Sequence, residues 1–248
     1  MRKQIIAGNW KMNMTMKRGK SLCSSILKDG QYTSREVVIV APFIHLESLI
    51  NQTKGSQIKV AAQNCHEQLS GAFTGEISAL MLSDMGLDYV LLGHSERRVY
   101  FNETNVLLSS KVNSVLLQGL KVIFCCGETL EQRKSGKYLD IVSQQISEAL
   151  FHLNPLDFKN IVLAYEPIWA IGSGKTASSL QAQEMHHHLR NFLARKFGSN
   201  LAENMSILYG GSCNPSNATE LFSQPDIDGG LIGGASLIAD DFISIIKS

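Results

Sequence analysis

The sequence lacks any excess of charge of one sign and any long apolar run. Its 23 lysines and arginines nearly balance 22 aspartates and glutamates, so the formal net charge is only +1. Such a balance provides no basic field to attract nucleic acid or an anionic membrane surface. No apolar stretch approaches the length of a membrane span, and the first residues carry no signal-peptide core. We therefore expect a cytoplasmic protein with no nucleic-acid or membrane partner, in which any anion site is local.

The sequence also lacks a cysteine framework. The five cysteines are odd in number and have no metal-ligand spacing: Cys23, Cys65, Cys125, Cys126 and Cys213. This usage is typical of reduced thiols in the cytoplasm, without disulfides or a cysteine-bound metal. The sequence leaves open whether the adjacent pair, Cys125 and Cys126, makes the protein more sensitive to thiol reagents.

Eight short apolar runs recur along the chain, and none alternates with polar residues. They occupy residues 5–7, 37–41, 60–62, 89–92, 122–125, 161–164, 207–209 and 231–232. Continuous apolar runs of this length are typical of strands buried on both faces of a parallel sheet.

Helical patterns separate these strands. They include residues 103–117, a segment from a capping box at Ser178 to Gly198, and residues 235–247. Asn214 followed by proline predicts a further helix start. Eight strand–helix units with no linker predict one single-domain (β/α)8 barrel over residues 1–248. A doubly wound open sheet is the alternative, but its glycine-rich fingerprint after the first strand is missing.

Polar and glycine-rich residues cluster just after the predicted strand ends. Asn9 and Lys11 follow the first strand, His94 the fourth, Glu166 the sixth, Gly210, Gly211 and Ser212 the seventh, and Gly233 and Gly234 the eighth. In such barrels the active site lies at this face, and the last two loops commonly bind phosphate. Glycine lets backbone N–H groups approach an anion closely.

Glu166 stands at the end of an apolar run, directly before a loop that begins with Pro167 and ends at Gly172 and Gly174. A base on a rigid strand beside a closing loop has this layout, although a solvated or ion-paired glutamate has it as well. The following Gly-Ser-Gly-Lys-Thr is no P-loop, because Trp169 occupies the position of its first glycine.

His94 and Lys11 complete the candidate chemistry. At a helix N-terminus the dipole disfavours the imidazolium form, so His94 would stay neutral and donate a hydrogen bond to a substrate oxygen. Lys11 either extends from the core to solvent or supplies positive charge to a pocket, and an anion site favours the second reading. The histidine triplet at residues 186–188 is expected to be a solvated helical stretch rather than a metal site.

With these residues assembled, the chain resembles the triosephosphate isomerase family from Ala7 to Leu237. The motifs occur in family order: GNWKMN at 8–13, QNC at 63–65, GAFTGEIS at 71–78, GHSERR at 93–98, CCGE at 125–128, the Glu166 segment at 164–177, YGGS at 209–212 and GGASL at 233–237. The resemblance implies a TIM barrel. It also implies interconversion of dihydroxyacetone phosphate and D-glyceraldehyde 3-phosphate through an enediolate, without cofactor or metal.

The resemblance assigns roles to individual residues. Glu166 is implied to be the base and His94 the neutral electrophile. Lys11 supplies positive charge, and Asn9 donates a hydrogen bond to the developing oxyanion. The backbone N–H groups implied to hold the phosphate of the triose phosphate belong to Gly172, Ser212, Gly233 and Gly234.

The resemblance also implies a homodimer. Its contact is the loop that begins at Gln63 and ends at Ile77, with Phe73 near the tip. Glu96 is expected to pair with Lys11 or its surroundings. Ser173, where the family more often has threonine, leaves the rate of loop closure open.

One alternative is another phosphate-binding barrel enzyme, such as a sugar-phosphate aldolase or an isomerase of amino-acid biosynthesis, and the other belongs to a non-catalytic class. A Schiff-base aldolase would need a lysine at a strand end inside the barrel, but Lys121 begins its strand and Lys175 lies in the closing loop. A non-catalytic or repurposed phosphate-binding barrel would typically lose the base, the electrophile or the lysine. Glu166, His94 and Lys11 are all present, which favours the isomerase.

Overall fold

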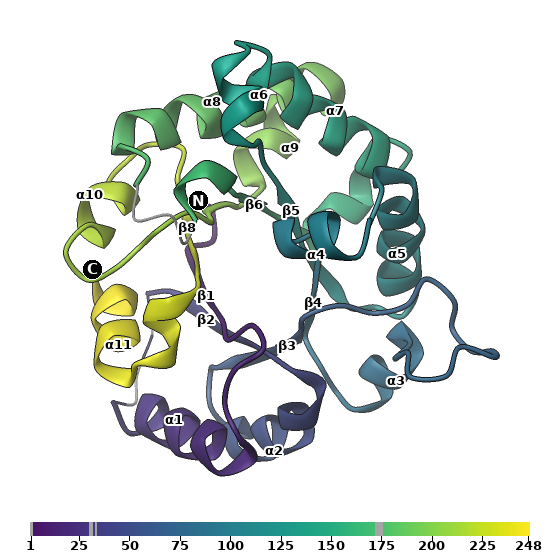
Figure 1. Ribbon diagram of the computed structural model, residues 1–248, viewed down its shortest axis with the longest axis vertical. Coiled ribbons are helices and arrows are strands. Elements are labelled where there is room, and N and C mark those ends of the chain that lie inside the picture. Colours follow the sequence, from purple (N-terminus) through teal and green to yellow (C-terminus); the bar gives the residue numbers. More distant parts are fainter. Residues whose placement is uncertain (1, 30–31, 33, 172–175) are drawn as a thin grey trace.

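The computed structural model describes residues 2–29, 32, 34–171 and 176–248. Within these residues, eight parallel strands close into one barrel in sequence order, as predicted (Figure 1). The strands are β1 (Ile5–Asn9), β2 (Glu36–Ala41), β3 (Lys59–Ala62), β4 (Tyr89–Leu92), β5 (Lys121–Cys126), β6 (Ile161–Tyr165), β7 (Ile207–Tyr209) and β8 (Gly229–Ile232). Each predicted apolar run lies within one of these strands.

Helices surround the strands as an outer ring (Figure 1). The α-helices are α1 (Met16–Asp29), α2 (Phe43–Thr53), α3 (Ala79–Asp84), α4 (Ser95–Tyr100), α5 (Asn105–Leu117), α6 (Leu130–Lys134), α7 (Tyr138–Leu150), α8 (Ser179–Phe197), α9 (Ser199–Asn204), α10 (Ala218–Phe222) and α11 (Ala239–Lys247). Short 3-10 helices are η1 (Pro155–Asn160), η2 (Ile168–Ala170) and η3 (Gly234–Leu237).

The apolar runs are continuous because both faces of each strand are buried. On β1, Ile5 and Ala7 belong to the cluster that fills the barrel, whereas Ile6 belongs to the cluster between the strands and the helices. On β5, Cys125 faces the barrel interior and Cys126 faces the helices. Side chains alternate between the two faces of a strand, so two apolar layers require apolar residues at successive positions.

Closure of the barrel depends on a glycine at the start of β8. Gly229 pairs with Ile5 and has a φ of 119°, a conformation that side chains with a Cβ rarely adopt. A Cβ atom at this position would lie 2.0 Å from the carbonyl oxygen of Ile5. Only glycine therefore allows β8 to approach β1 this closely.

The predicted helix boundaries are partly confirmed. Ser178 caps α8 through the predicted capping box, and Gly198 ends that helix. The pattern at 103–117 begins slightly later, because the side chain of Thr104 caps α5. The pattern at 235–247 is divided into η3 and α11 by the extended residue Ile238.

Two expectations about helices were wrong. Asn214 does not cap a helix that begins at Pro215: its Oδ1 accepts the N–H of Ser216 at 2.9 Å, and α10 begins only at Ala218. The histidine triplet is not a solvated stretch, because His186 is fully buried. His186 faces Tyr165 edge-on, with ring centroids 5.8 Å apart.

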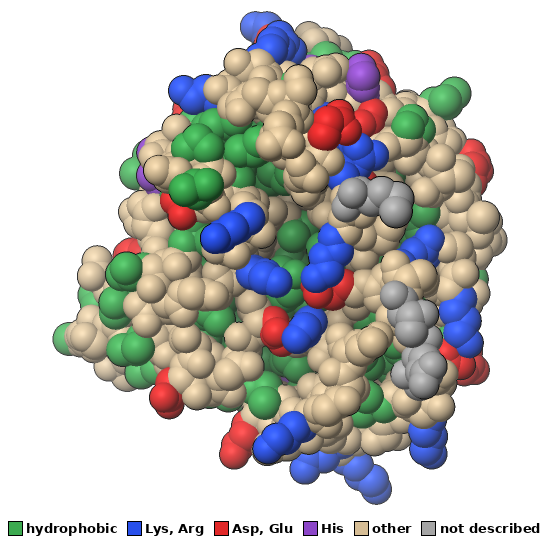
Figure 2. All heavy atoms as spheres, turned by 180° about the vertical axis from the view of Figure 1, so that it is seen from behind, with side chains coloured by type: hydrophobic (Ala, Val, Ile, Leu, Met, Phe, Trp, Pro, Cys, Tyr) green, Lys and Arg blue, Asp and Glu red, His purple; other side chains and the backbone are tan. Residues whose placement is uncertain are grey.

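Basic and acidic side chains are interspersed on the face opposite to that of Figure 1 (Figure 2). Ion pairs also form just before or at the amino ends of the strands. Arg2 Nε lies 2.7 Å from Asp228 Oδ1, and Lys59 Nζ lies 3.0 Å from Asp88 Oδ1. This mixture agrees with the small net charge and leaves no extended basic field on the face shown.

Candidate active site

Glu166 directly follows β6 and is almost completely buried. Its Oε2 accepts the backbone N–H of Ser95 at 2.9 Å, and its Oε1 lies 3.1 Å from Nε2 of His94. The backbone N–H of Glu166 donates to the carbonyl of Cys126 at 2.8 Å. The end of β5 and the start of α4 therefore fix the carboxylate in a largely water-free position.

Gly127 makes room for the backbone of Glu166. A Cβ atom on Gly127 would lie 1.8 Å from the carbonyl oxygen of Glu166, far inside contact distance. Its N–H and C=O are both held by the side-chain amide of Gln145 at 2.9 Å. Gly127 occurs in a family motif, but sequence reasoning assigned it no role.

His94 occupies the N-cap position of α4, as the sequence predicts. Its Nδ1 accepts the backbone N–H of Glu96 at 3.2 Å. A ring nitrogen that accepts this bond carries no proton, so the proton of the neutral ring lies on Nε2. Nε2 is the nitrogen that faces Glu166, and it is therefore available as a donor inside the site.

Lys11 adopts a left-handed backbone conformation with a φ of 51°. Oδ1 of Asn9 accepts its N–H at 3.0 Å, and Nε2 of Gln63 donates to its carbonyl at 3.0 Å. The Nζ atom contacts Oε1 of Glu96 at 2.6 Å, so the expected pair is confirmed. Side chains from β1 and from the loop after β3 thus offset the strain of this conformation.

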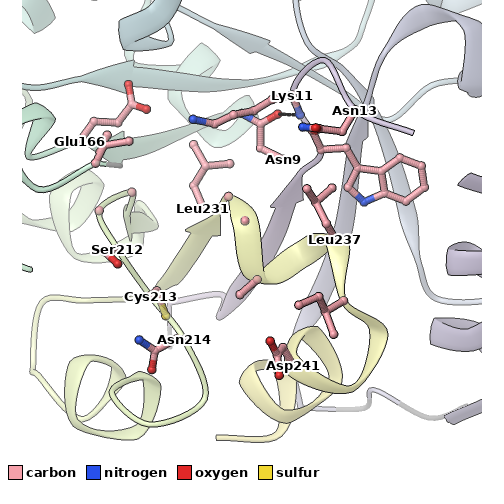
Figure 3. A pocket seen from close by; sticks show the side chains of 18 of the residues that line it. Asn9, Lys11, Asn13, Glu166, Ser212, Cys213, Asn214, Leu231, Leu237 and Asp241 are labelled. Carbon is pink, nitrogen blue, oxygen red and sulfur yellow. Dashed lines mark hydrogen bonds between the residues drawn. The ribbon is translucent and has the colours of Figure 1, made fainter. Parts of the chain in front are cut away.

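A cavity of about 440 Å³ opens where the carboxyl ends of the strands meet. Its lining includes the predicted residues Asn9, Lys11, His94, Glu166, Gly210, Gly211, Ser212, Gly233 and Gly234. Lys11 and Glu166 point toward each other across one part of the cavity, and Ser212 lies along another wall (Figure 3). Gly172, the remaining predicted phosphate ligand, lies outside the described residues, as does Ser173.

Unpaired backbone amides line one side of this cavity. Among the described residues, the N–H groups of Ser212, Gly233 and Gly234 donate to no other protein group. A Cβ on Gly233 would meet only Lys11 Cε, at 3.7 Å, and a Cβ on Gly234 would meet nothing within 4 Å. Exposed N–H groups beside a lysine form a suitable cradle for an anion.

The family model described as "Triosephosphate isomerase" matches residues 4–248. The chain belongs to the triosephosphate isomerase family. The triosephosphate isomerases of Porphyromonas gingivalis and Cytophaga hutchinsonii are each 53% identical to it over 251 residues, which cover all of both chains. That of Flavobacterium psychrophilum is 50% identical over 248 residues, which cover all of this chain and 99% of the relative.

Glu128, within the family motif CCGE, anchors the start of the loop after Glu166. It is fully buried, and its Oε1 accepts bonds from Trp169 Nε1 at 2.8 Å, Tyr165 Oη at 3.0 Å and Arg133 Nη1 at 3.1 Å. The N–H of Ile168 also donates to the Glu128 carbonyl at 3.1 Å. A single buried carboxylate thus connects β6, η2 and α6, a function that sequence reasoning missed.

The cysteines do not form a reactive pair. All five are free and buried, and Cys125 and Cys126 project from opposite faces of β5. Burial raises the pKa of Cys126 to about 12. Burial and the nearby carboxylate of Glu166 raise the pKa of Cys125 well above its usual value. Burial therefore suppresses the reactive thiolate at both residues, which argues against a thiol-sensitive pair.

The described part of the chain contains no group of three or more histidine, cysteine, aspartate or glutamate side chains suited to a metal ion. No helix in the described ranges is both long and apolar enough to cross a membrane.

Proposed function

We propose that the chain, acting as a single domain, interconverts dihydroxyacetone phosphate and D-glyceraldehyde 3-phosphate through an enediolate, with no cofactor or metal. Membership of the triosephosphate isomerase family supports the reaction. The observation that carries the residue roles is the buried contact between Glu166 and His94 inside the cavity. It brings a carboxylate base and a neutral donor together at one wall.

Glu166 moves the proton between the two carbons of the triose. A buried carboxylate is a stronger base toward a C–H group because little water stabilises its charge. Without substrate, Glu166 is bonded by Ser95 and lies against His94. When a substrate oxygen accepts the hydrogen bond from Nε2 of His94, Oε1 of Glu166 loses this partner and is free to reach the substrate carbon.

His94, Lys11 and Asn9 stabilise the charge that develops on the substrate oxygens. His94 donates from Nε2, Lys11 provides a positive charge, and the side-chain amide of Asn9 donates a further hydrogen bond. The phosphate accepts hydrogen bonds from the backbone N–H groups of Gly172, Ser212, Gly233 and Gly234. Contacts at the phosphate, remote from the reacting carbons, orient the triose for proton transfer.

A coupled assay of glyceraldehyde 3-phosphate isomerisation tests the reaction and its base. The Glu166→Gln variant keeps the size of the side chain but loses the base, so kcat should fall at least about 1000-fold. Glu166→Asp withdraws the carboxylate by one methylene and should lower kcat about 100-fold while inorganic phosphate inhibits as before. Equal loss of turnover and phosphate inhibition would contradict the assignment, and far-UV circular dichroism checks that both variants fold.

We further propose a homodimer that forms through residues 63–77, from Gln63 to Ile77. This loop projects beyond the barrel between β3 and α3 (Figure 1). Its base is closed by the N–H of His66 on the Ile77 carbonyl at 2.8 Å, and Phe73 is 44% exposed near its tip. Analytical ultracentrifugation should show a dimer that Phe73→Asp shifts toward monomer. Leu156→Asp, at an exposed leucine of η1, should leave the dimer intact.

A cytoplasmic location fits this assignment. Free cysteines are typical of a reducing compartment, and the triose phosphates are intermediates of glycolysis.

A further inference from the structure

Ser236 lies directly behind the two glycines that line the cavity. It is fully buried in η3 and does not line the cavity itself. Its Oγ donates to the carbonyl of Gly233 at 2.7 Å, and its backbone N–H donates to the same oxygen at 2.9 Å. Its Oγ also lies 3.4 Å from the carbonyl oxygen of Asn9 at the end of β1.

These bonds determine where the next amide points. In a trans peptide unit the C=O and the following N–H point in opposite directions. The carbonyl of Gly233 is held from behind by Ser236, so the N–H of Gly234 is directed away from Ser236. Gly234 lines the cavity, and in the described residues its N–H has no acceptor. The orientation of this donor is thus set by a residue that an anion in the cavity would not touch.

The Ser236 hydroxyl helps to orient the peptide between Gly233 and Gly234, but the turn from Gly233 to Ser236 does not need it. The backbone N–H of Ser236 already closes the turn on Gly233, and alanine would preserve that bond. Oγ supplies the second bond, which restrains rotation of the peptide plane between Gly233 and Gly234. Its contact toward Asn9 links the same plane to the residue whose side chain holds the Lys11 N–H. One buried hydroxyl therefore joins the end of β1 to the loop after β8.

We propose that Ser236 is a positioning residue that aims the Gly234 N–H at the phosphate of the substrate. The proposal rests on the phosphate site described under the proposed function. A donor that is already oriented loses no conformational entropy when the anion binds. Without the Ser236 hydroxyl the Gly234 N–H must be ordered on binding, so the substitution weakens phosphate binding more than it weakens the fold.

Ser236→Ala and Ser206→Ala form a matched pair. Ser206 is also buried, and its Oγ donates to the Lys3 carbonyl at 2.7 Å, but it lies before β7 at the amino end of the barrel. Each substitution removes a hydroxyl-to-carbonyl bond of 2.7 Å, and Ser236→Ala also removes the longer contact of 3.4 Å with the Asn9 carbonyl. Thermal unfolding should show comparable destabilisation for the two variants.

The decisive comparison uses substrates with and without phosphate. Ser236→Ala should lower kcat/KM for glyceraldehyde 3-phosphate about tenfold, mainly through KM, and weaken inhibition by inorganic phosphate to a similar extent. Its kcat/KM for D-glyceraldehyde, which has no phosphate, should stay within about twofold of the wild type, and Ser206→Ala should change neither substrate.

Two results would overturn the positioning role. They are an equal loss with both substrates, or no loss with glyceraldehyde 3-phosphate. An inactive wild type would instead contradict the proposed reaction, and the weakened phosphate inhibition can be checked separately by direct phosphate titration.

Discussion

Gly127 and Glu166 are in such close contact that a Cβ atom on Gly127 would lie 1.8 Å from the Glu166 carbonyl oxygen. The obstructing group would be backbone, which cannot rotate away as a side chain can. Any larger residue at position 127 must therefore displace the strand end that carries the proposed base.

We expect Gly127→Ala to lower kcat about 100-fold, because a displacement of about 1 Å at a catalytic group has an effect of this size. The free energy of unfolding should fall by about 2 kcal/mol from overpacking. The control is Gly230→Ala on β8, whose Cβ would meet the side-chain atom Ile232 Cδ1 at 2.7 Å. It should reduce stability but leave kcat within about threefold. Steady-state kinetics gives kcat and urea unfolding gives the stability of each variant. An equal loss of activity in both variants would contradict the prediction.

Glu128→Gln tests the anchor beneath the start of the closing loop. The substitution keeps the shape of the side chain but replaces the carboxylate, whose Oε1 accepts hydrogen bonds from Trp169, Tyr165 and Arg133, by a neutral amide. Charge-assisted bonds are roughly twice as strong as neutral ones, so we expect about 2 kcal/mol lower stability and about a tenfold lower kcat/KM.

Glu184→Gln is the matched control for the Glu128 prediction. Glu184 contacts the same Arg133 at 3.3 Å, but its side chain is half-exposed. Stability and kcat/KM should change little, because exposed ion pairs contribute little. Thermal unfolding and steady-state kinetics measure both effects. Similar losses in the two variants would assign the effect to Arg133 rather than to the loop anchor.

The barrel could be predicted because burial on both faces of every strand leaves a continuous apolar signal. Helix starts were less predictable where a capping pattern, such as Asn214 followed by proline, forms a turn instead of a helix cap. Oδ1 of Asn217 accepts the N–H of Asn214 at 2.9 Å, and its Nδ2 donates to the Ser212 carbonyl at 3.2 Å. This segment supports the loop after β7 before α10 begins. The sequence signal at Asn214 is a turn, and only tertiary contacts distinguish it from a helix cap.

The same distinction applies to the site. Glu166, His94 and Lys11 could be selected as candidates because each is a polar residue within two positions of a strand end, and all three line one cavity. Gly127 and Ser236 act through contacts with the backbone of other residues, and no residue type or spacing signals such contacts. His186 was misjudged because helical spacing does not reveal which face of α8 packs against Tyr165.

The native chain should be inert to thiol reagents. Burial raises the pKa of Cys23 to about 11 and that of Cys65, Cys126 and Cys213 to about 12. Burial also raises the pKa of Cys125 well above its usual value. Less than one thiol per chain should react with Ellman's reagent within an hour at pH 8, whereas all five should react in denaturant. Rapid labelling of Cys126 in the folded protein, located by mass spectrometry, would contradict this expectation.

His186 should make the protein less stable as the pH falls. Burial lowers the pKa of His186 from 6.5 to about 3, outweighing the opposing contact with the Asp226 carbonyl. Between these two values the unfolded chain binds a proton that the folded chain does not, so stability decreases with falling pH across this window. At pH 5 the loss from this one group is about 2 kcal/mol.

His186→Gln removes the titrating ring and should flatten the pH dependence of stability between pH 7.5 and pH 5 by about that amount. His152→Gln, at an exposed histidine, controls for the replacement of a histidine by glutamine. Urea unfolding of both variants and the wild type at the two pH values makes the comparison. Parallel pH profiles of the wild type and the His186→Gln variant would contradict the prediction, because they would show that burial does not keep His186 neutral at pH 5. Among the described residues, its Nε2 has no hydrogen-bond partner.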